Sequence, residues 1–215
     1  MAKYDVKFSC GHEETIVLFG KETERKRKIE WFERNGICSK CYKECLDEET
    51  NYIKEECNAY GLTITIGTEK QIKAAYKIAA KYFKDHDNAV VKIKNEIAKC
   101  QEQNPERAQK MQASLEEGIL VRQLALIKIN SKFWLDNQYN IFDALNKEFK
   151  VYNGNIPTLP PKPDIIIGSW NGRIYGKEGK YRIYIDNTEV FITDEQAKEI
   201  AEYSKFGEDK SPKNI

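Results

Sequence analysis

The sequence predicts an α+β fold with a short β-rich segment at each end of the chain and a helical region in the middle. Apolar and polar residues alternate near both ends, as in half-buried strands, whereas apolar residues in the middle recur every three or four positions, as in amphipathic helices. A cluster of prolines within residues 157–163 marks an extended linker. We expect five parts, at residues 1–60, 61–152, 153–164 (the linker), 165–206 and 207–215 (a disordered tail).

Composition limits the classes of function. The chain has 215 residues, with 35 basic and 34 acidic side chains and a net charge of +1. Bulk charge therefore cannot draw it to nucleic acid, and any such site must be a local patch. The sequence contains no apolar run of membrane-spanning length, and its first residues lack the layout of a signal peptide. We expect a cytoplasmic protein.

The first 60 residues predict a β-hairpin followed by two helices. Tyr4, Val6 and Phe8 alternate with polar residues, and a second apolar run at 15–19 supplies the other strand. Asn35-Gly36 then ends the first helix. The expected order after the hairpin is a charged helix at 22–34, a second turn at 37–41 and an acidic helix at 42–60.

Two pairs of metal-binding side chains fall on the two predicted turns. Cys10 and His12 belong to the hairpin turn, and Cys38 and Cys41 to the second turn. Cysteines in the reducing cytoplasm are thiols or metal ligands rather than disulfides. Four sulfur and nitrogen ligands suit tetrahedral Zn²⁺, and with all four positions filled by protein no site is left for a catalytic water. We predict a zinc ribbon with a structural ion.

Two alternatives stay open at this site. Cys45 lies one helical turn beyond Cys41 and is a substitute for His12 as the fourth ligand. A redox-active Cys38-x-x-Cys41 pair is the other alternative, although the sequence lacks the buried parallel strand that precedes this motif in redox folds.

The middle of the chain predicts three helices. Thr68 and Gln71 have the form of a capping box and start the first one. The polar run at 85–88 is expected to break it, and Asn104-Pro105 is expected to open the last one, with Trp134 in its core-facing stripe. The expected bounds are 68–83, 90–103 and 106–136.

One face of the first of these helices carries five lysines at three- and four-residue steps. Such a stripe is a candidate track for the phosphates of a nucleic acid, and a solvated helix surface is the alternative. The lysines are Lys70, Lys73, Lys77, Lys81 and Lys84.

The C-terminal region predicts a small antiparallel β-meander and one helix. The strand at 181–185 places Arg182 and Tyr184 on one face, which is a second candidate contact for nucleic acid or protein, or an ordinary half-solvated sheet. Thr193 begins a second capping box and a helix to about residue 203. The sequence does not decide whether the side chain of Trp170 is buried or exposed. The expected strands are 165–167, 173–176, 181–185 and 190–192.

Catalytic motifs are weak in this sequence. His86 stands between Asp85 and Asp87, but neighbours in a loop point in different directions. We find no glycine-rich phosphate loop, no serine elbow and no second histidine outside the ligand pair. Carboxylates at 44–56 are a weak candidate for a hydrolase site, and we expect a non-enzymatic protein.

Three parts of the sequence carry a resemblance to known proteins. They are Tyr4–His12 through Leu18–Lys21 and on to Cys38–Tyr42, then Gly67–Ile72 with Ser131–Asn137, and last Tyr175–Lys177. Together they resemble a group of uncharacterised proteins encoded on phages and mobile elements of Gram-positive gut bacteria. In those proteins a tryptophan often follows three residues after the Gln71 equivalent, where this chain has Ala74. The resemblance implies a small zinc-holding accessory protein that handles DNA or interferes with host machinery.

Two functions follow as expectations. The first is a zinc-containing accessory protein of a phage or mobile element that binds nucleic acid or a nucleoprotein complex through the five lysines, with Arg182 and Tyr184 as a second contact. The alternative is a protein-directed inhibitor of a host defence nuclease, similar in role to an anti-CRISPR protein. The balanced charge favours the alternative, because protein partners meet through apolar patches with a polar rim.

Overall fold

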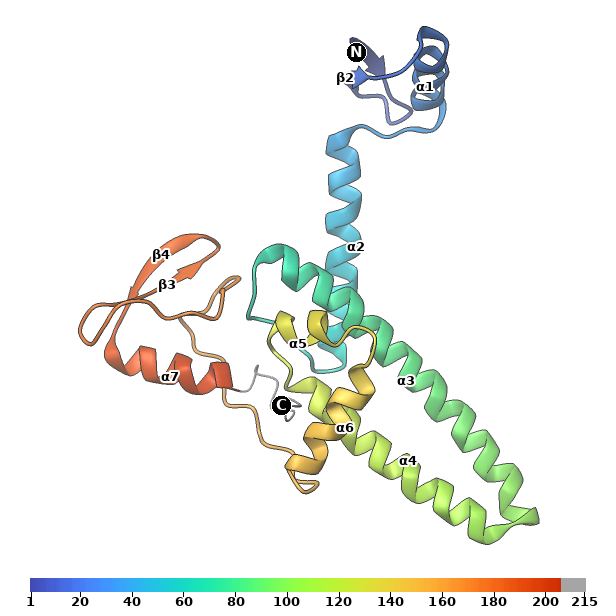
Figure 1. Ribbon diagram of the computed structural model, residues 1–215, viewed down its shortest axis with the longest axis vertical. Coiled ribbons are helices and arrows are strands. Elements are labelled where there is room, and N and C mark those ends of the chain that lie inside the picture. The colour runs from blue at the N-terminus through green and yellow to red at the C-terminus, as the bar shows by residue number, and fades with distance from the viewer. Residues whose placement is uncertain (206–215) are drawn as a thin grey trace. The chain divides into compact units, whose positions relative to one another are not determined.

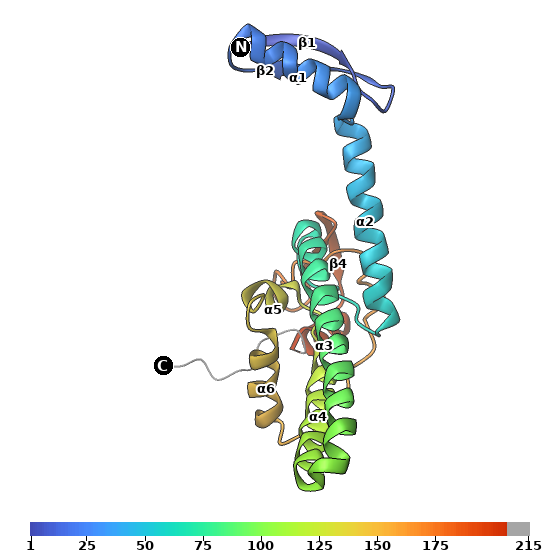
Figure 2. The ribbon, with the colours of Figure 1, turned by 90° about the vertical axis from the view of Figure 1, so that its right-hand side faces the viewer.

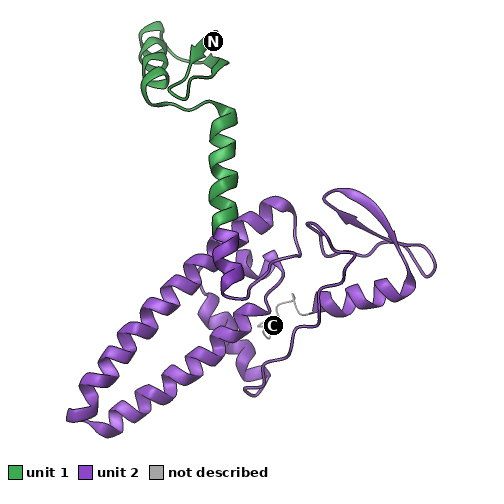
Figure 3. Cartoon of the chain, turned by 180° about the vertical axis from the view of Figure 1, so that it is seen from behind, with its two compact units in different colours: residues 1–52 green, residues 53–215 purple. Residues whose placement is uncertain are grey.

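The computed structural model describes residues 1–205, so the tail predicted at 207–215 lies outside the described residues. The chain divides into two compact units, Met1–Tyr52 and Ile53–Ile215 (Figure 3). The boundary falls inside α2, which runs over Ser39–Ala59. The fold is α+β as predicted, mostly helical with one small antiparallel hairpin near each end. In the part of the chain that is described, no helix is long and apolar enough to cross a membrane.

The first unit holds a hairpin, one helix and the start of α2. Strand β1 (Ala2–Lys7) pairs antiparallel with β2 (Glu13–Leu18), and α1 covers Glu22–Asn35, as the sequence predicts. The hydrophobic cluster here is small, with Val6, Phe8 and Cys38 buried. Every residue of α1 is half-buried or exposed. So small a core supplies little folding free energy, and the unit needs a further constraint.

The second unit is built around an antiparallel pair of long helices, α3 and α4, which lie side by side in Figures 1 and 2. Helices α5 and α6 pack against α3 and α4 respectively. The elements are α3 (Glu69–Gln103), α4 (Pro105–Leu126), α5 (Ser131–Asp136), α6 (Ile141–Val151), β3 (Tyr181–Ile185), β4 (Thr188–Ile192) and α7 (Asp194–Lys205).

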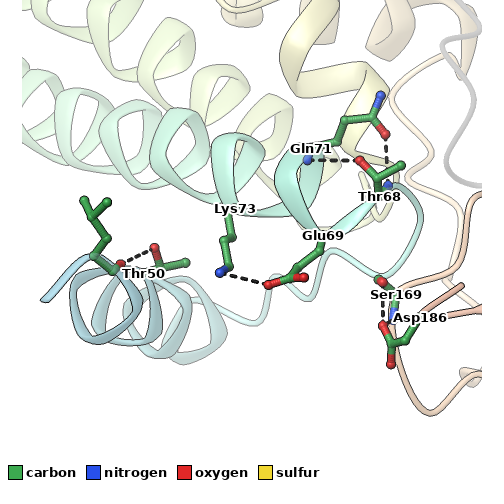
Figure 4. A network of polar contacts seen from close by, with 8 residues as sticks. Thr50, Thr68, Glu69, Gln71, Lys73, Ser169 and Asp186 are labelled. Carbon is green, nitrogen blue, oxygen red and sulfur yellow. Dashed lines mark hydrogen bonds and ion pairs between the residues drawn. The ribbon is translucent and has the colours of Figure 1, made fainter. Parts of the chain in front are cut away.

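Both predicted capping boxes are present. The Thr68 hydroxyl accepts a hydrogen bond from the Gln71 amide nitrogen at 3.3 Å, and the Gln71 side chain accepts one from the Thr68 nitrogen at 2.9 Å (Figure 4). Thr193 and Gln196 make the same reciprocal pair at the start of α7. These bonds satisfy backbone N–H groups that a helix start leaves without partners, so the sequence places both starts correctly.

The predicted break at 85–88 is wrong, because α3 continues through it to Gln103. Asp87 accepts a hydrogen bond from the Tyr60 hydroxyl at 2.9 Å and lies 3.4 Å from the Arg122 guanidinium of α4. The polar residues therefore have tertiary partners while they stay helical, and this outweighs their weak helix propensity.

The single helix predicted at 106–136 is two helices separated by residues 127–130. The Ile129 carbonyl accepts hydrogen bonds from the nitrogens of Thr65 and Ile66, at 2.9 and 3.0 Å. The Asn130 side chain then accepts a hydrogen bond from the nitrogen of Lys132 and caps α5. Backbone pairing with the segment at 65–66 thus replaces helical bonds that the sequence pattern alone favoured. Trp134 is fully buried, as predicted.

The C-terminal meander reduces to the β3–β4 hairpin with single-residue bridges. Residues 165–167 form no strand, and within 173–176 only Tyr175 pairs, with Arg182. Trp170, whose exposure the sequence left open, is fully buried. Its carbonyl accepts a hydrogen bond from Gly67 at 2.6 Å, and the Thr65 and Tyr203 hydroxyls lie 3.0 Å apart. The C-terminal segment therefore docks on residues 65–67.

A buried ion pair crosses the main core. The Lys128 ammonium donates to the two carboxylate oxygens of Glu148 at 2.6 and 2.5 Å, and both side chains are 1% exposed. The ammonium also lies 5.0 Å from the centre of the Phe133 ring, and the Trp134 indole donates to the Lys128 carbonyl. The pair therefore fixes the 127–130 connection against α6.

We predict that Lys128→Met destabilises the protein by about 3–5 kcal/mol, because it leaves the Glu148 carboxylate buried without its partner. The double variant Lys128→Met/Glu148→Leu should recover much of this loss, since no unpaired charge remains. Urea unfolding followed by circular dichroism measures both. Lys110→Met, which removes an exposed pair with Glu106, is the control and should leave the urea midpoint unchanged. A Lys128→Met midpoint equal to this control would contradict the prediction.

Candidate metal centre

Four donor side chains converge in the first unit. Cys10 and His12 come from the loop between β1 and β2, Cys38 directly precedes α2, and Cys41 lies in its first turn. The sulfur atoms and a ring nitrogen of these residues all lie within 4.8 Å of one another. The four predicted ligands are therefore brought together and could bind a metal ion. One detail differs, because α2 starts at Ser39 and so places Cys41 in the helix rather than on a turn.

The first loop is shaped by backbone hydrogen bonds. The Phe8 nitrogen donates to the His12 carbonyl at 2.9 Å, and the Gly11 nitrogen donates to the Phe8 carbonyl at the same distance. Gly11 has φ +83°, a conformation that side chains with a Cβ rarely adopt. The turn therefore points Cys10 and His12 to the same side.

A clamp that the sequence reasoning missed holds the second pair in place. The Glu14 carboxylate of β2 accepts hydrogen bonds from the Ser39 nitrogen at 2.8 Å and from the Ser39 hydroxyl at 2.7 Å. These bonds hold the pKa of Glu14 below its usual value. A carboxylate at a helix N-terminus is favoured by the helix dipole. Glu14 thus ties the start of α2 to the hairpin that carries the other two ligands.

The donor atoms lie close to the separations of a tetrahedral site. The Cys41 sulfur lies 3.3 Å from His12 Nδ1. In a tetrahedral site with metal–sulfur bonds of about 2.3 Å, ligand atoms lie roughly 3.5–3.8 Å apart. The backbone nitrogens of Cys38 and Cys41 lie 3.3 and 3.4 Å from the sulfurs of Cys10 and Cys38. Such N–H donors favour the thiolate form, which is the form that binds metals.

The thiols differ in acidity. Hydrogen bonds from the backbone of Cys38, and then from that of His12, lower the pKa of Cys10 to about 6. The side-chain hydrogen bond with Cys38 is the largest cause that raises the pKa of Cys41, to about 12. Desolvation and the neighbouring Cys10 thiol raise it further. Several thiolates this close repel one another unless a cation neutralises them. Without a cation, repulsion between the thiolates would disfavour this arrangement. A bound metal ion would remove the repulsion and stabilise it.

The other cysteines lie outside this cluster. The side chain of Cys45 is exposed on α2, so the structure places His12, and not Cys45, with the three thiols. Cys57 is buried in the core of the second unit, where desolvation raises the pKa of its thiol to about 12. Neither Cys45 nor Cys57 belongs to the group of donor side chains that could hold a metal ion.

The five predicted contact lysines share one face of α3. At about 100° per residue they fall within an arc of about 80°. The buried residues of α3, among them Tyr76, Ala79 and Phe83, occupy the opposite side. Lys73 pairs with Glu69 at 2.9 Å (Figure 4), and it is the only half-buried member of the stripe. The exposed members are Lys70, Lys77, Lys81 and Lys84.

Arg182 and Tyr184 lie on the outer face of β3, as predicted, and both contact Glu189 of β4. The Arg182 guanidinium is 3.2 Å from the Glu189 carboxylate, and the Tyr184 hydroxyl donates to it at 3.1 Å. Tyr184 also lines a small depression next to Thr68, where the lysine-bearing helix begins. The carboxylate neutralises the charge of Arg182, so this face is a weaker candidate for phosphates than the lysine stripe.

His86 has no catalytic arrangement around it in the described chain. Its ring lies within the α3–α4 packing at 10% exposure, and burial lowers its pKa. The nearest carboxylate, that of Asp87, is 3.8 Å from Nδ1 and is engaged with Tyr60 and Arg122.

Comparisons with protein families, with characterised proteins and with solved structures found no match to this chain.

We predict that Cys38→Ser abolishes stoichiometric metal binding, whereas Cys45→Ser retains it. Cys38 is buried at the centre of the ligand set, and Cys45 is outside it. Elemental mass spectrometry of purified protein measures the metal content. Because the first unit has so small a core, chelation should also open residues 1–52 to protease while the second unit stays resistant. Equal metal loss in both variants, or no metal in the parent protein, would contradict the assignment.

In metal-loaded protein at pH 7, we predict that iodoacetamide modifies Cys45 and leaves Cys10 and Cys41 unmodified. The side chain of Cys45 is exposed outside the ligand set, whereas a bound ion would occupy the sulfurs of Cys10 and Cys41. Chelation should remove this protection. Peptide mass mapping after timed quenching gives the three rates. Equal modification of all three residues in metal-loaded protein would refute the prediction.

Proposed function

We propose that the protein is a non-enzymatic binding protein whose first unit is held together by a structural Zn²⁺. Three thiolates and one imidazole are the donor set that Zn²⁺ favours in structural sites. Cys10, His12, Cys38 and Cys41 would fill all four positions, which leaves none for a water or substrate. The small core of the first unit supports the same interpretation, because metal binding supplies folding free energy to units of this size.

We further propose that the partner is nucleic acid or a nucleoprotein complex. The observation that carries this proposal is the lysine stripe on the face of α3 opposite its buried side. From Lys70 to Lys84 the stripe extends about 21 Å, which is long enough to contact several successive phosphates. Because the net charge is only +1, attraction to phosphates would have to come from this local patch and not from bulk charge.

The resemblance to proteins of phages and mobile elements supplies the proposed context, an accessory protein that acts on nucleic acid in the cytoplasm. Tyr184, beside the start of α3, is the proposed second contact, with Arg182 next to it.

A protein-directed inhibitor of a host defence nuclease is the second candidate. Two exposed aromatic side chains of the first unit favour it, Phe19 at 64% exposure and Trp31 at 55%. Aromatic residues are enriched where proteins bind proteins. This candidate predicts that Trp31→Ala weakens capture of a nuclease and leaves nucleic-acid binding intact.

For the nucleic-acid proposal, Lys81→Ala/Lys84→Ala should weaken binding to all sequences alike. It should also reduce the slope of log affinity against log salt by about two, because each lost phosphate contact removes about one released counterion. Fluorescence anisotropy with labelled DNA between 50 and 200 mM salt measures this.

The matched control is Lys99→Ala/Lys110→Ala, which removes two exposed ammonium groups farther along the α3–α4 pair. It should retain the parental affinity and slope. If neither duplexes nor single strands of DNA or RNA bind at low salt, the nucleic-acid proposal fails.

A further inference from the structure

A groove of about 620 Å³ adjoins the lysine stripe. One wall comes from α3 and includes Lys77, Lys81 and Tyr82, and the other comes from residues 138–143, at the connection between α5 and α6. Its volume lies in the range of small-molecule binding sites. The lysines could be identified from the sequence. The second wall could not, because nothing in the sequence places residues 138–143 beside α3.

Two aromatic rings of the second wall are exposed. The side chain of Tyr139 is 89% exposed, and that of Phe142 is 45% exposed. An exposed ring next to basic side chains is the arrangement that stacks unpaired bases, because every base offers an aromatic face. Lys77 and Lys81 line the opposite wall and join the groove to the rest of the stripe, Lys70 and Lys84, along which the phosphates of the same strand would pass.

The remaining polar groups of the groove suit base edges rather than further phosphates. Gln138 and Asn140 supply amides, and Asp85 and Asp143 supply carboxylates. These two carboxylates offset the charges of Lys77 and Lys81, so the groove itself is close to neutral. Amides and carboxylates accept hydrogen bonds from base amino groups. Tyr82 also lines the groove, and its hydroxyl has no hydrogen-bond partner within the described chain.

We propose that this groove binds unpaired bases of a nucleic-acid strand, with Tyr139 and Phe142 as stacking platforms. The inference rests on the proposed nucleic-acid function and specifies its substrate as a single strand. A duplex keeps its bases stacked and paired, and turning one out costs a few kcal/mol. An exposed ring in a near-neutral groove is therefore accessible to a single strand and closed to an intact duplex, which could reach only the lysines.

The test compares a 15-nucleotide unstructured single strand with the duplex of the same sequence by fluorescence anisotropy. Tyr139→Ala should weaken single-strand binding by about 5- to 150-fold, the range for loss of one stacked base, and leave duplex binding unchanged. Tyr139→Trp should retain single-strand binding, and its added indole fluorescence should be quenched by the strand. The matched control is Tyr52→Ala, which removes an exposed aromatic ring from the first unit.

The outcomes separate this inference from the function on which it rests. If neither form binds, as DNA or as RNA, the proposed function fails and the groove proposal fails with it. If both forms bind through Lys81 and Lys84 but Tyr139→Ala changes neither, the protein is a phosphate binder and the groove proposal is wrong. A loss of single-strand affinity equal to that of Tyr52→Ala would also overturn it.

Discussion

The convergence of four donor atoms on one point organises the first unit. A loop between two strands and the first turn of a helix must face each other before three sulfurs and an imidazole can lie within 4.8 Å. Glu14 enforces this by capping α2 from the neighbouring strand. With Val6, Phe8, Leu18 and Cys38 as its buried apolar residues, the unit has little apolar area to oppose chain entropy. The proposed ion would therefore be the main source of order in this unit.

The two sides of α3 have different roles in the second unit. Tyr76, Ala79 and Phe83 of α3 are buried in the main core, so that side is fixed by packing. The opposite side carries the lysines, of which Lys73 is half-buried and pairs with Glu69 and the other four are exposed. Because the helix is anchored over its first four turns, the ammonium groups project from a rigid support, and a partner would bind without first ordering the backbone.

Local signals in the sequence were sufficient for elements whose causes are local. Both capping boxes and the first hairpin could be predicted, since each depends on residues close in sequence. Cys10 with His12, and Cys38 with Cys41, each show the short spacing of a ligand pair, and this is why the sequence could predict that the two pairs converge although 28 positions separate Cys10 from Cys38. The predictions were wrong where contacts with residues distant in the sequence determine the local structure. Tyr60 and Arg122 keep Asp87 helical, and residues 65–66 take the hydrogen bonds that would have extended α4. The groove beside α3 was missed for the same reason.

The docking of the C-terminal segment has a consequence for synthesis on the ribosome. Thr65 meets Tyr203 across 138 positions of sequence, and the apolar cluster around Ile66 and Trp170 is completed by α7. Contacts of such long separation form slowly, and here they cannot form until residue 203 has emerged from the ribosome. During translation the side chains of Ile66 and Ile129 therefore stay exposed until α7 has been synthesised. A nascent chain stalled before Asp194 would expose this surface to chaperones, whereas the helices of the main core could already be complete.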